Sequence, residues 1–62
     1  MNHVEVKIVN GKFTPMLYAD GRVFQLAGFH DYDFAEGYAK ALSESLKITY
    51  KHNSKLALTG KD

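Results

Sequence analysis

The chain has 62 residues, no cysteine and a formal net charge of +1 at pH 7. The lack of cysteine excludes disulfides and thiolate metal sites. Near-balanced charge and 45% hydrophobic residues argue against intrinsic disorder. A domain of this size buries only about 60% of the surface of its unfolded chain, so its core is small. With no apolar run of membrane-spanning length and no signal peptide, we expect a cytoplasmic protein.

Two dipeptides, Asn10-Gly11 and Asp20-Gly21, predict two β-hairpins. Each follows and precedes alternating apolar residues, and each suits a two-residue type I′ turn, in which both central residues need positive φ. The first part of the chain is therefore predicted to form a three-stranded antiparallel β-meander over about residues 3–9, 12–19 and 22–28.

The register set by these turns places the large apolar residues on one face of the sheet, because strand side chains alternate. Pro15 falls in the middle strand, where its missing N–H would face the third strand. Either one ladder hydrogen bond with Leu26 is absent, or the third strand bulges there. The alternative is that it pairs only near its turn and then leaves. The predicted inner face consists of Val4, Val6, Ile8, Phe13, Pro15, Leu17, Phe24 and Leu26.

One α-helix is predicted over about residues 33–47, with Asp33 and Glu36 as a capping box. It should end near Leu46 or Lys47, because β-branched and aromatic residues follow; continuation to Tyr50 is the alternative. Its apolar stripe, expected to lie on Phe13, Leu17, Phe24 and Leu26, comprises Phe34, Ala35, Tyr38, Ala39, Ala41, Leu42, Ser45 and Leu46. A row of small residues, Gly37, Ala41 and Ser45, would let the helix approach the sheet or a second copy.

These elements predict an α+β fold of order β-β-β-α, with residues 1–50 as one small domain and residues 51–62 as a basic C-terminal tail. The tail is expected to be frayed, as chain ends commonly are. A short strand within residues 55–60 is the alternative.

Side chains for catalysis do not converge in this sequence. No serine lies at a strand-to-helix elbow, and the histidines have no recognised metal spacing. His30, Asp31 and Asp33 form the one acidic and histidine cluster, and Asp33 has a role as helix cap. We therefore expect no catalytic residue, no metal, no cofactor and no enzymatic activity.

The first functional hypothesis is a small protein-interaction module, an adaptor or inhibitor that docks on a larger protein. Its candidate binding residues, chosen because tyrosine and methionine are enriched at interfaces, are Met16, Tyr18, Val23 and Tyr32. A homodimer is a further option, because an exposed first strand can pair with a copy of itself, although His3, Glu5 and Lys7 guard that edge.

The alternative hypothesis is a nucleic-acid-binding domain. A three-stranded sheet backed by one helix is similar in outline to the sheet-reading DNA-binding domains of integrase arms and plant transcription factors, although no sequence motif is shared. The candidate phosphate-contacting residues are Lys7, Lys12 and Arg22 on the exposed sheet face and Lys47, Lys51 and Lys55 after the helix. Glu5 on the same face, and an isoelectric point of about 8.0, rank this hypothesis second.

Overall fold

Both predicted glycine turns form in the computed structural model, which describes residues 2–52. Their φ angles are 52° and 76° at Asn10-Gly11 and 54° and 75° at Asp20-Gly21. Positive φ at both central positions is the signature of a type I′ turn. The turns join three antiparallel strands, β1 (His3–Val9), β2 (Lys12–Ala19) and β3 (Arg22–Gln25).

The strand register is the one that the turns predict. In the first hairpin Val9 pairs with Lys12 and His3 with Tyr18. In the second, Ala19 pairs with Arg22 and the ladder continues to Gln25. The predicted β-meander is therefore confirmed, and so is the shared face of the paired apolar residues of β1 and β2. The placement of Arg22 on the exposed face is wrong, because its pairing with Ala19 puts it on the opposite face.

The third strand is shorter than predicted, because it ends at Gln25 instead of near residue 28. Beyond it, the Leu26 N–H still donates to the Pro15 carbonyl at 3.1 Å. Phe29 then returns to the sheet and exchanges two hydrogen bonds of 2.8 Å with Phe13.

A bulge next to the proline accounts for this interruption. Between the two sets of hydrogen bonds, Ala27 and Gly28 oppose the single residue Thr14, which is the residue count of a β-bulge. A Cβ added to Gly28 would lie 2.9 Å from the Cβ of Lys12. Of the arrangements predicted around Pro15, the bulge is therefore the one found, opposite the neighbouring residue Thr14, and its close packing requires glycine.

Helix α1 (Tyr32–Leu46) begins one residue earlier than predicted. Its N-cap is Asp31, in extended conformation, whose carboxylate accepts a hydrogen bond of 3.1 Å from the Asp33 N–H. The predicted capping box of Asp33 and Glu36 is thus wrong. Asp33 instead lies in the first turn, where its charge favours the helix dipole.

The helix ends where the sequence indicates. Lys47 adopts a left-handed conformation with φ of 58°, and the Ile48 N–H donates to the Ser43 carbonyl at 2.9 Å. Such a residue closes a helix by satisfying its last carbonyl groups. The alternative of a helix continuing to Tyr50 is wrong.

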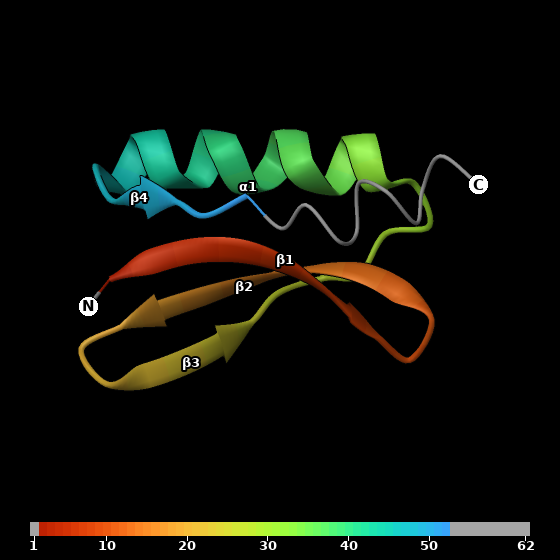
Figure 1. Ribbon diagram of the computed structural model, residues 1–62, viewed down its shortest axis with the longest axis horizontal. Coiled ribbons are helices and arrows are strands. Elements are labelled where there is room, and N and C mark those ends of the chain that lie inside the picture. Colours follow the sequence, from red (N-terminus) through yellow and green to blue (C-terminus); the bar gives the residue numbers. More distant parts are fainter. Residues whose placement is uncertain (1, 53–62) are drawn as a thin grey trace.

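A fourth strand, β4 (Thr49–Tyr50), was not predicted at this place. It pairs in parallel with β1, with His3 opposite Thr49, and gives the strand order β3-β2-β1-β4 (Figure 1). The Lys51 N–H adds a hydrogen bond of 2.7 Å to the Val4 carbonyl. Strand β4 therefore covers β1 at His3 and Val4, so the expectation that β1 forms an exposed edge is wrong at this end of the strand.

The core lies between α1 and strands β1, β2 and β4, with the helix on one face of the sheet (Figure 1). Val4, Val6, Ala35 and Ala39 are fully buried. Partly buried residues around them are Phe13, Leu17, Phe29, Tyr32, Leu42, Ile48 and Tyr50.

Phe24 is 44% exposed and is not among the hydrophobic residues packed against the core, so the predicted packing of the helix on this residue of β3 is wrong. The helical stripe differs from the prediction as well, because Phe34 and Tyr38 are exposed at 62% and 45%. Small residues at positions 35, 39 and 43 face the sheet and let the helix approach it. The predicted small-residue row at positions 37, 41 and 45 is exposed instead.

Residues 53–62, with the predicted frayed tail and the alternative strand, lie outside the described residues. Within residues 2–52 the single helix has neither the length nor the hydropathy to cross a membrane.

Candidate functional site

Helix α1 covers one face of the sheet and leaves the other, here named the open face. Pairing register and side-chain alternation assign its residues. They are His3, Glu5, Lys7 and Val9 of β1, Lys12, Thr14, Met16 and Tyr18 of β2, Val23 and Gln25 of β3, and Thr49 and Lys51 at β4.

Tyr18 is held in place on the open face by two side chains of β1. Its ring stacks on that of His3, the residue opposite it, with centroids 4.4 Å apart and an interplanar angle of 12°. The Lys7 Nζ lies 5.4 Å from the same ring centroid, within the range of a cation–π interaction. Both contacts restrict the Tyr18 rotamer on a surface that remains partly accessible.

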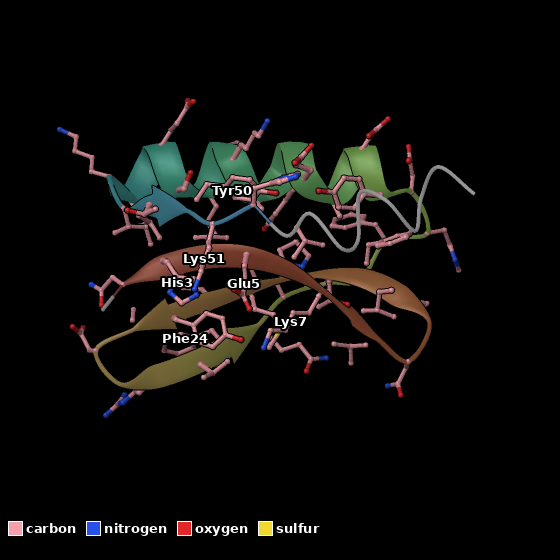
Figure 2. The ribbon with its side chains drawn as sticks, viewed as in Figure 1. His3, Glu5, Lys7, Phe24, Tyr50 and Lys51 are labelled. Carbon is pink, nitrogen blue, oxygen red and sulfur yellow. The ribbon has the colours of Figure 1, made fainter. Side chains whose placement is uncertain are left out.

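Glu5 lies between the side chains of His3 and Lys7 on β1 and contacts both (Figure 2). Its Oε1 lies 3.4 Å from His3 Nε2 and its Oε2 lies 3.3 Å from Lys7 Nζ. Hydrogen bonding to Tyr18 and then to Glu5 raises the pKa of Lys7 above its ordinary 10.5. Lys7 therefore stays protonated at neutral pH, while Glu5 locally offsets its charge.

An apolar patch, formed by Met16, Tyr18 and Val23, lies across strands β2 and β3. Val23 is directly opposite Tyr18 and is 55% exposed. Met16 precedes Tyr18 by two residues, so it lies on the same face. The structure thus brings together three of the four residues singled out for protein binding.

Tyr32, the fourth of these residues, lies elsewhere. It begins helix α1, packs against the core and donates its hydroxyl hydrogen to Glu36 Oε2 at 3.0 Å. Its ring meets that of Phe13 edge to face, with centroids 5.5 Å apart. The side chain therefore belongs to the helix-covered side of the sheet.

The six lysine and arginine residues singled out for nucleic-acid binding are divided among several places. Lys7, Lys12 and Lys51 belong to the open face, whereas Arg22 alternates with Val23 and so belongs to the other face. Lys47 caps the far end of the helix, and Lys55 lies outside the described residues.

A hollow at the β1–β4 end of the open face is lined by Asn2, His3, Thr49 and Lys51. Figure 2 shows His3 and Lys51 near each other at this end of the sheet. The amide, imidazole, hydroxyl and ammonium groups of these residues are all able to donate hydrogen bonds. The hollow thus extends the open face beyond the apolar patch with a polar, cationic region.

A second cluster, centred on Glu36, joins the helix to the strand after it. Glu36 Oε2 accepts hydrogen bonds of 3.0 Å from both Tyr32 and Tyr50, and it lies 3.2 Å from His52 Nδ1. The Lys40 Nζ lies 5.8 Å from the Tyr50 ring centroid. We call Tyr32, Glu36, Tyr50 and His52 the Glu36 cluster.

Ionisation in the Glu36 cluster follows from these contacts. Burial opposes the charge of Glu36, but hydrogen bonds from Tyr50, Tyr32 and His52 outweigh it and lower its pKa below 4.5. Burial, together with the neighbouring hydroxyl and carboxylate, raises the pKa of Tyr50 far above 10. Burial likewise raises the pKa of Tyr32. At neutral pH the cluster is therefore one carboxylate held by two neutral phenols and the imidazole.

Sequence reasoning missed the Glu36 cluster. The spacing of Tyr32 and Glu36, four residues apart on a helix, was a readable signal for one of its hydrogen bonds. Nothing in the local sequence indicated the contributions of Tyr50 and His52, because these depend on the pairing of β4 with β1.

Among residues 2–52, no three histidine, aspartate or glutamate side chains are grouped so that they could hold a metal ion. No family model matches the sequence, and searches of curated proteins and of solved structures found no match. The physical features of the open face are thus the basis for a functional assignment.

Proposed function

We propose that this protein is a small non-enzymatic binding module, an adaptor or inhibitor, that docks on a larger protein partner through the open face. The observation that carries this proposal is the apolar patch of Met16, Tyr18 and Val23 on a face that the helix does not cover. Aromatic and methionine side chains are enriched in the centre of protein interfaces. We place this activity in the cytoplasm, with which a chain free of cysteine agrees.

Charges around the apolar patch favour a partner with an acidic rim. Lys7, Lys12 and Lys51 belong to the open face, and Glu5, its single carboxylate among the described residues, is only 15% exposed and already contacts His3 and Lys7. Complementary charges at the edge of an interface steer association and set orientation. A surface with an apolar centre and surrounding aspartate or glutamate residues would fit both features.

The ordering of Tyr18 supports its role as the anchor of this interface. Binding normally costs about 0.5–1.5 kcal/mol for each flexible side chain that it immobilises. Stacking on His3 and the contact with Lys7 already restrict Tyr18 in the free protein. Its ring is therefore available to a partner at a lower entropic cost.

A capture experiment with paired variants tests this proposal. The immobilised protein is used to capture binding partners from a cell extract with and without nuclease, and the captured partner is then titrated. Replacing both Met16 and Tyr18 by serine should weaken binding at least about tenfold, as truncation of interface anchors does. The matched control is Phe34→Ser, which removes an exposed aromatic side chain from the helix and should leave binding intact. Equal binding by wild type and the double variant would reject the open face.

Nucleic-acid binding remains a second candidate with weaker support. Lys7 and Lys12 are on the open face, but Glu5 offsets the charge of Lys7, and Arg22 belongs to the other face. Fluorescence anisotropy with random duplex and single-stranded DNA at low salt separates the two candidates. Affinity that falls steeply with salt would favour nucleic acid, because phosphate binding releases counterions.

A further inference from the structure

Among residues 2–52, strand β3 is an outer edge of the sheet with no strand paired beyond it. It lies at the opposite end of the strand order from β4, and all four of its residues are exposed (Figure 1). Edges of natural sheets are usually blunted by charges, proline or a covering element. Between Val23 and Gly28 the sequence has neither a charge nor a proline.

The hydrogen-bonding groups at this edge alternate in a known way. Ala19 and Arg22 flank a two-residue turn and therefore exchange hydrogen bonds, as do Leu17 and Phe24 two residues further along. The backbone N–H and C=O groups of Val23 and Gln25 consequently point away from β2. The inward hydrogen bond of Leu26 to Pro15 agrees with this alternation.

We propose that β3 pairs with β3 of a second copy of this chain, antiparallel and about a two-fold axis at Phe24. In this register Val23 of each copy exchanges hydrogen bonds with Gln25 of the other. Shifting the axis to Val23 would pair Gln25 with the turn residue Gly21. Shifting it to Gln25 would pair Val23 with Ala27 in the bulge. The register centred on Phe24 alone uses all outward groups of β3 on both copies.

Side chains at the axis fit this arrangement. The two copies of Phe24 would lie directly opposite each other as a non-hydrogen-bonded pair, the type with the closest side chains. Phe24 lies on the helix-covered face but is 44% exposed, because helix α1 packs on β1, β2 and β4 rather than on the edge strand β3. Figure 2 labels Phe24 on the sheet, away from the helix. Aromatic pairs across strands stabilise a sheet.

Charge placement also favours a second copy as the occupant. Arg22 would face Leu26 of the other chain and not another arginine, so the symmetric pairing opposes no like charges. The tip of one hairpin, with Asp20, would approach the bulge of the other, where the Lys12 side chain lies against Gly28. Opposite charges therefore meet at both ends of the paired strands.

Pairing of this kind would join the open faces of the two copies into one continuous surface. The apolar patch of each copy lies next to the shared edge, because Val23 belongs to the patch and also to strand β3. This inference does not depend on the proposed docking function, since self-association is measured on the isolated protein.

Sedimentation of the full-length chain over a range of concentrations tests the dimer. We expect a concentration-dependent dimer for wild type and a monomer for Gln25→Pro, because proline removes an outward N–H that the pairing with β2 does not use. Gln25→Thr keeps that N–H and should still dimerise. A wild type that stays monomeric to about 1 mM, or a Gln25→Pro variant that dimerises like wild type, would overturn the proposal.

Oxidative crosslinking tests the register without relying on the proline variant. The chain has no cysteine, so Phe24→Cys introduces a single thiol. Opposed residues of a non-hydrogen-bonded pair lie about 4.5 Å apart at Cα, within disulfide range. We expect rapid dimeric crosslinking of Phe24→Cys and slow crosslinking of Ile8→Cys, which is equally exposed but on β1. Equal rates for both variants would contradict pairing at β3.

Discussion

Val4 and Phe24 lie on the same face of one sheet, two strands apart, and both were predicted to belong to its inner face. Val4 is fully buried, whereas Phe24 is 44% exposed. The difference arises because helix α1 packs on β1, β2 and β4, whereas all four residues of β3 are exposed. Alternation in a strand thus determines which face a residue occupies, and the lateral position of the helix determines whether that face is buried there.

The largest expected effect comes from comparing a buried valine of β1, Val6, with an exposed valine of β3, Val23. Val6→Asp should abolish folding, because an unpaired charge in the core costs several kcal/mol, comparable with the roughly 3–9 kcal/mol total stability of a chain this small. Val23→Asp should cost less than about 1 kcal/mol, since its side chain is 55% exposed. Thermal unfolding followed by circular dichroism measures both. A cooperative wild-type-like transition in Val6→Asp would contradict the described core.

The next largest effect is expected at the Glu36 cluster, which fastens β4 to the helix. Glu36→Gln replaces the acceptor of hydrogen bonds from Tyr32 and Tyr50 and should destabilise the fold by roughly 1–3 kcal/mol. Glu44→Gln is the matched control, because Glu44 is exposed on the same helix. Urea titrations measure both free energies of unfolding. Equal stabilities of Glu36→Gln and Glu44→Gln would show that the Glu36 cluster does not stabilise the fold.

The same cluster should make stability depend on acid. The pKa of Glu36 is lowered in the folded protein, so its contribution is present above about pH 4.5 and is lost as the pH falls through the folded value. The stability difference between wild type and Glu36→Gln should therefore be largest near neutral pH and shrink towards about pH 3. Urea midpoints across this range test it, and a difference that grows on acidification would contradict the assignment.

A smaller effect is expected from substitutions at two glycines, one in the crowded bulge and one on the open surface of the helix. Gly28→Ala should destabilise by about 1–2 kcal/mol, because its Cβ would collide with the Cβ of Lys12 in the bulge. Gly37→Ala should stabilise by about 0.5–1 kcal/mol, since an added Cβ meets nothing within 4 Å and alanine favours the helix. Melting temperatures should move in opposite directions, and a shift of the same sign in both would argue against the bulge geometry.

The smallest expected effect separates the observed helix cap from the predicted one. Asp31→Ala should cost about 1 kcal/mol, because it removes the acceptor of the Asp33 N–H. Asp33→Ala loses a favourable charge near the helix start and should cost less, about 0.3–0.5 kcal/mol. Thermal unfolding at low salt compares them, and a larger loss for Asp33→Ala would restore the sequence-based assignment.

Features governed by local chemistry could be predicted from the sequence. The two I′ turns require positive φ, and their residue types fix the strand register and hence the two faces of the sheet. The open-face grouping of Met16, Tyr18 and Val23 follows from that register alone. The end of the helix was also readable, because Ile48 and Thr49 disfavour helix after Leu46.

Features governed by long-range packing could not be predicted. A strand as short as β4 has no periodicity of its own, and its place beside β1 is set by the return of the helix over the sheet. The exposure of Phe24 and the convergence of Tyr50 and His52 on Glu36 both follow from that return. The shift of the cap from Asp33 to Asp31 is a different case, since two aspartates two residues apart offer the same local chemistry.

The Glu36 cluster also gives this protein an intrinsic optical reporter. The chain has no tryptophan, so its four tyrosines provide its ultraviolet emission. A phenol that donates to a carboxylate emits weakly, and Tyr32 and Tyr50 both donate to Glu36. Detachment of β4 from the helix would release both rings and brighten the protein, so a fluorimeter can follow this end of the fold without an added dye.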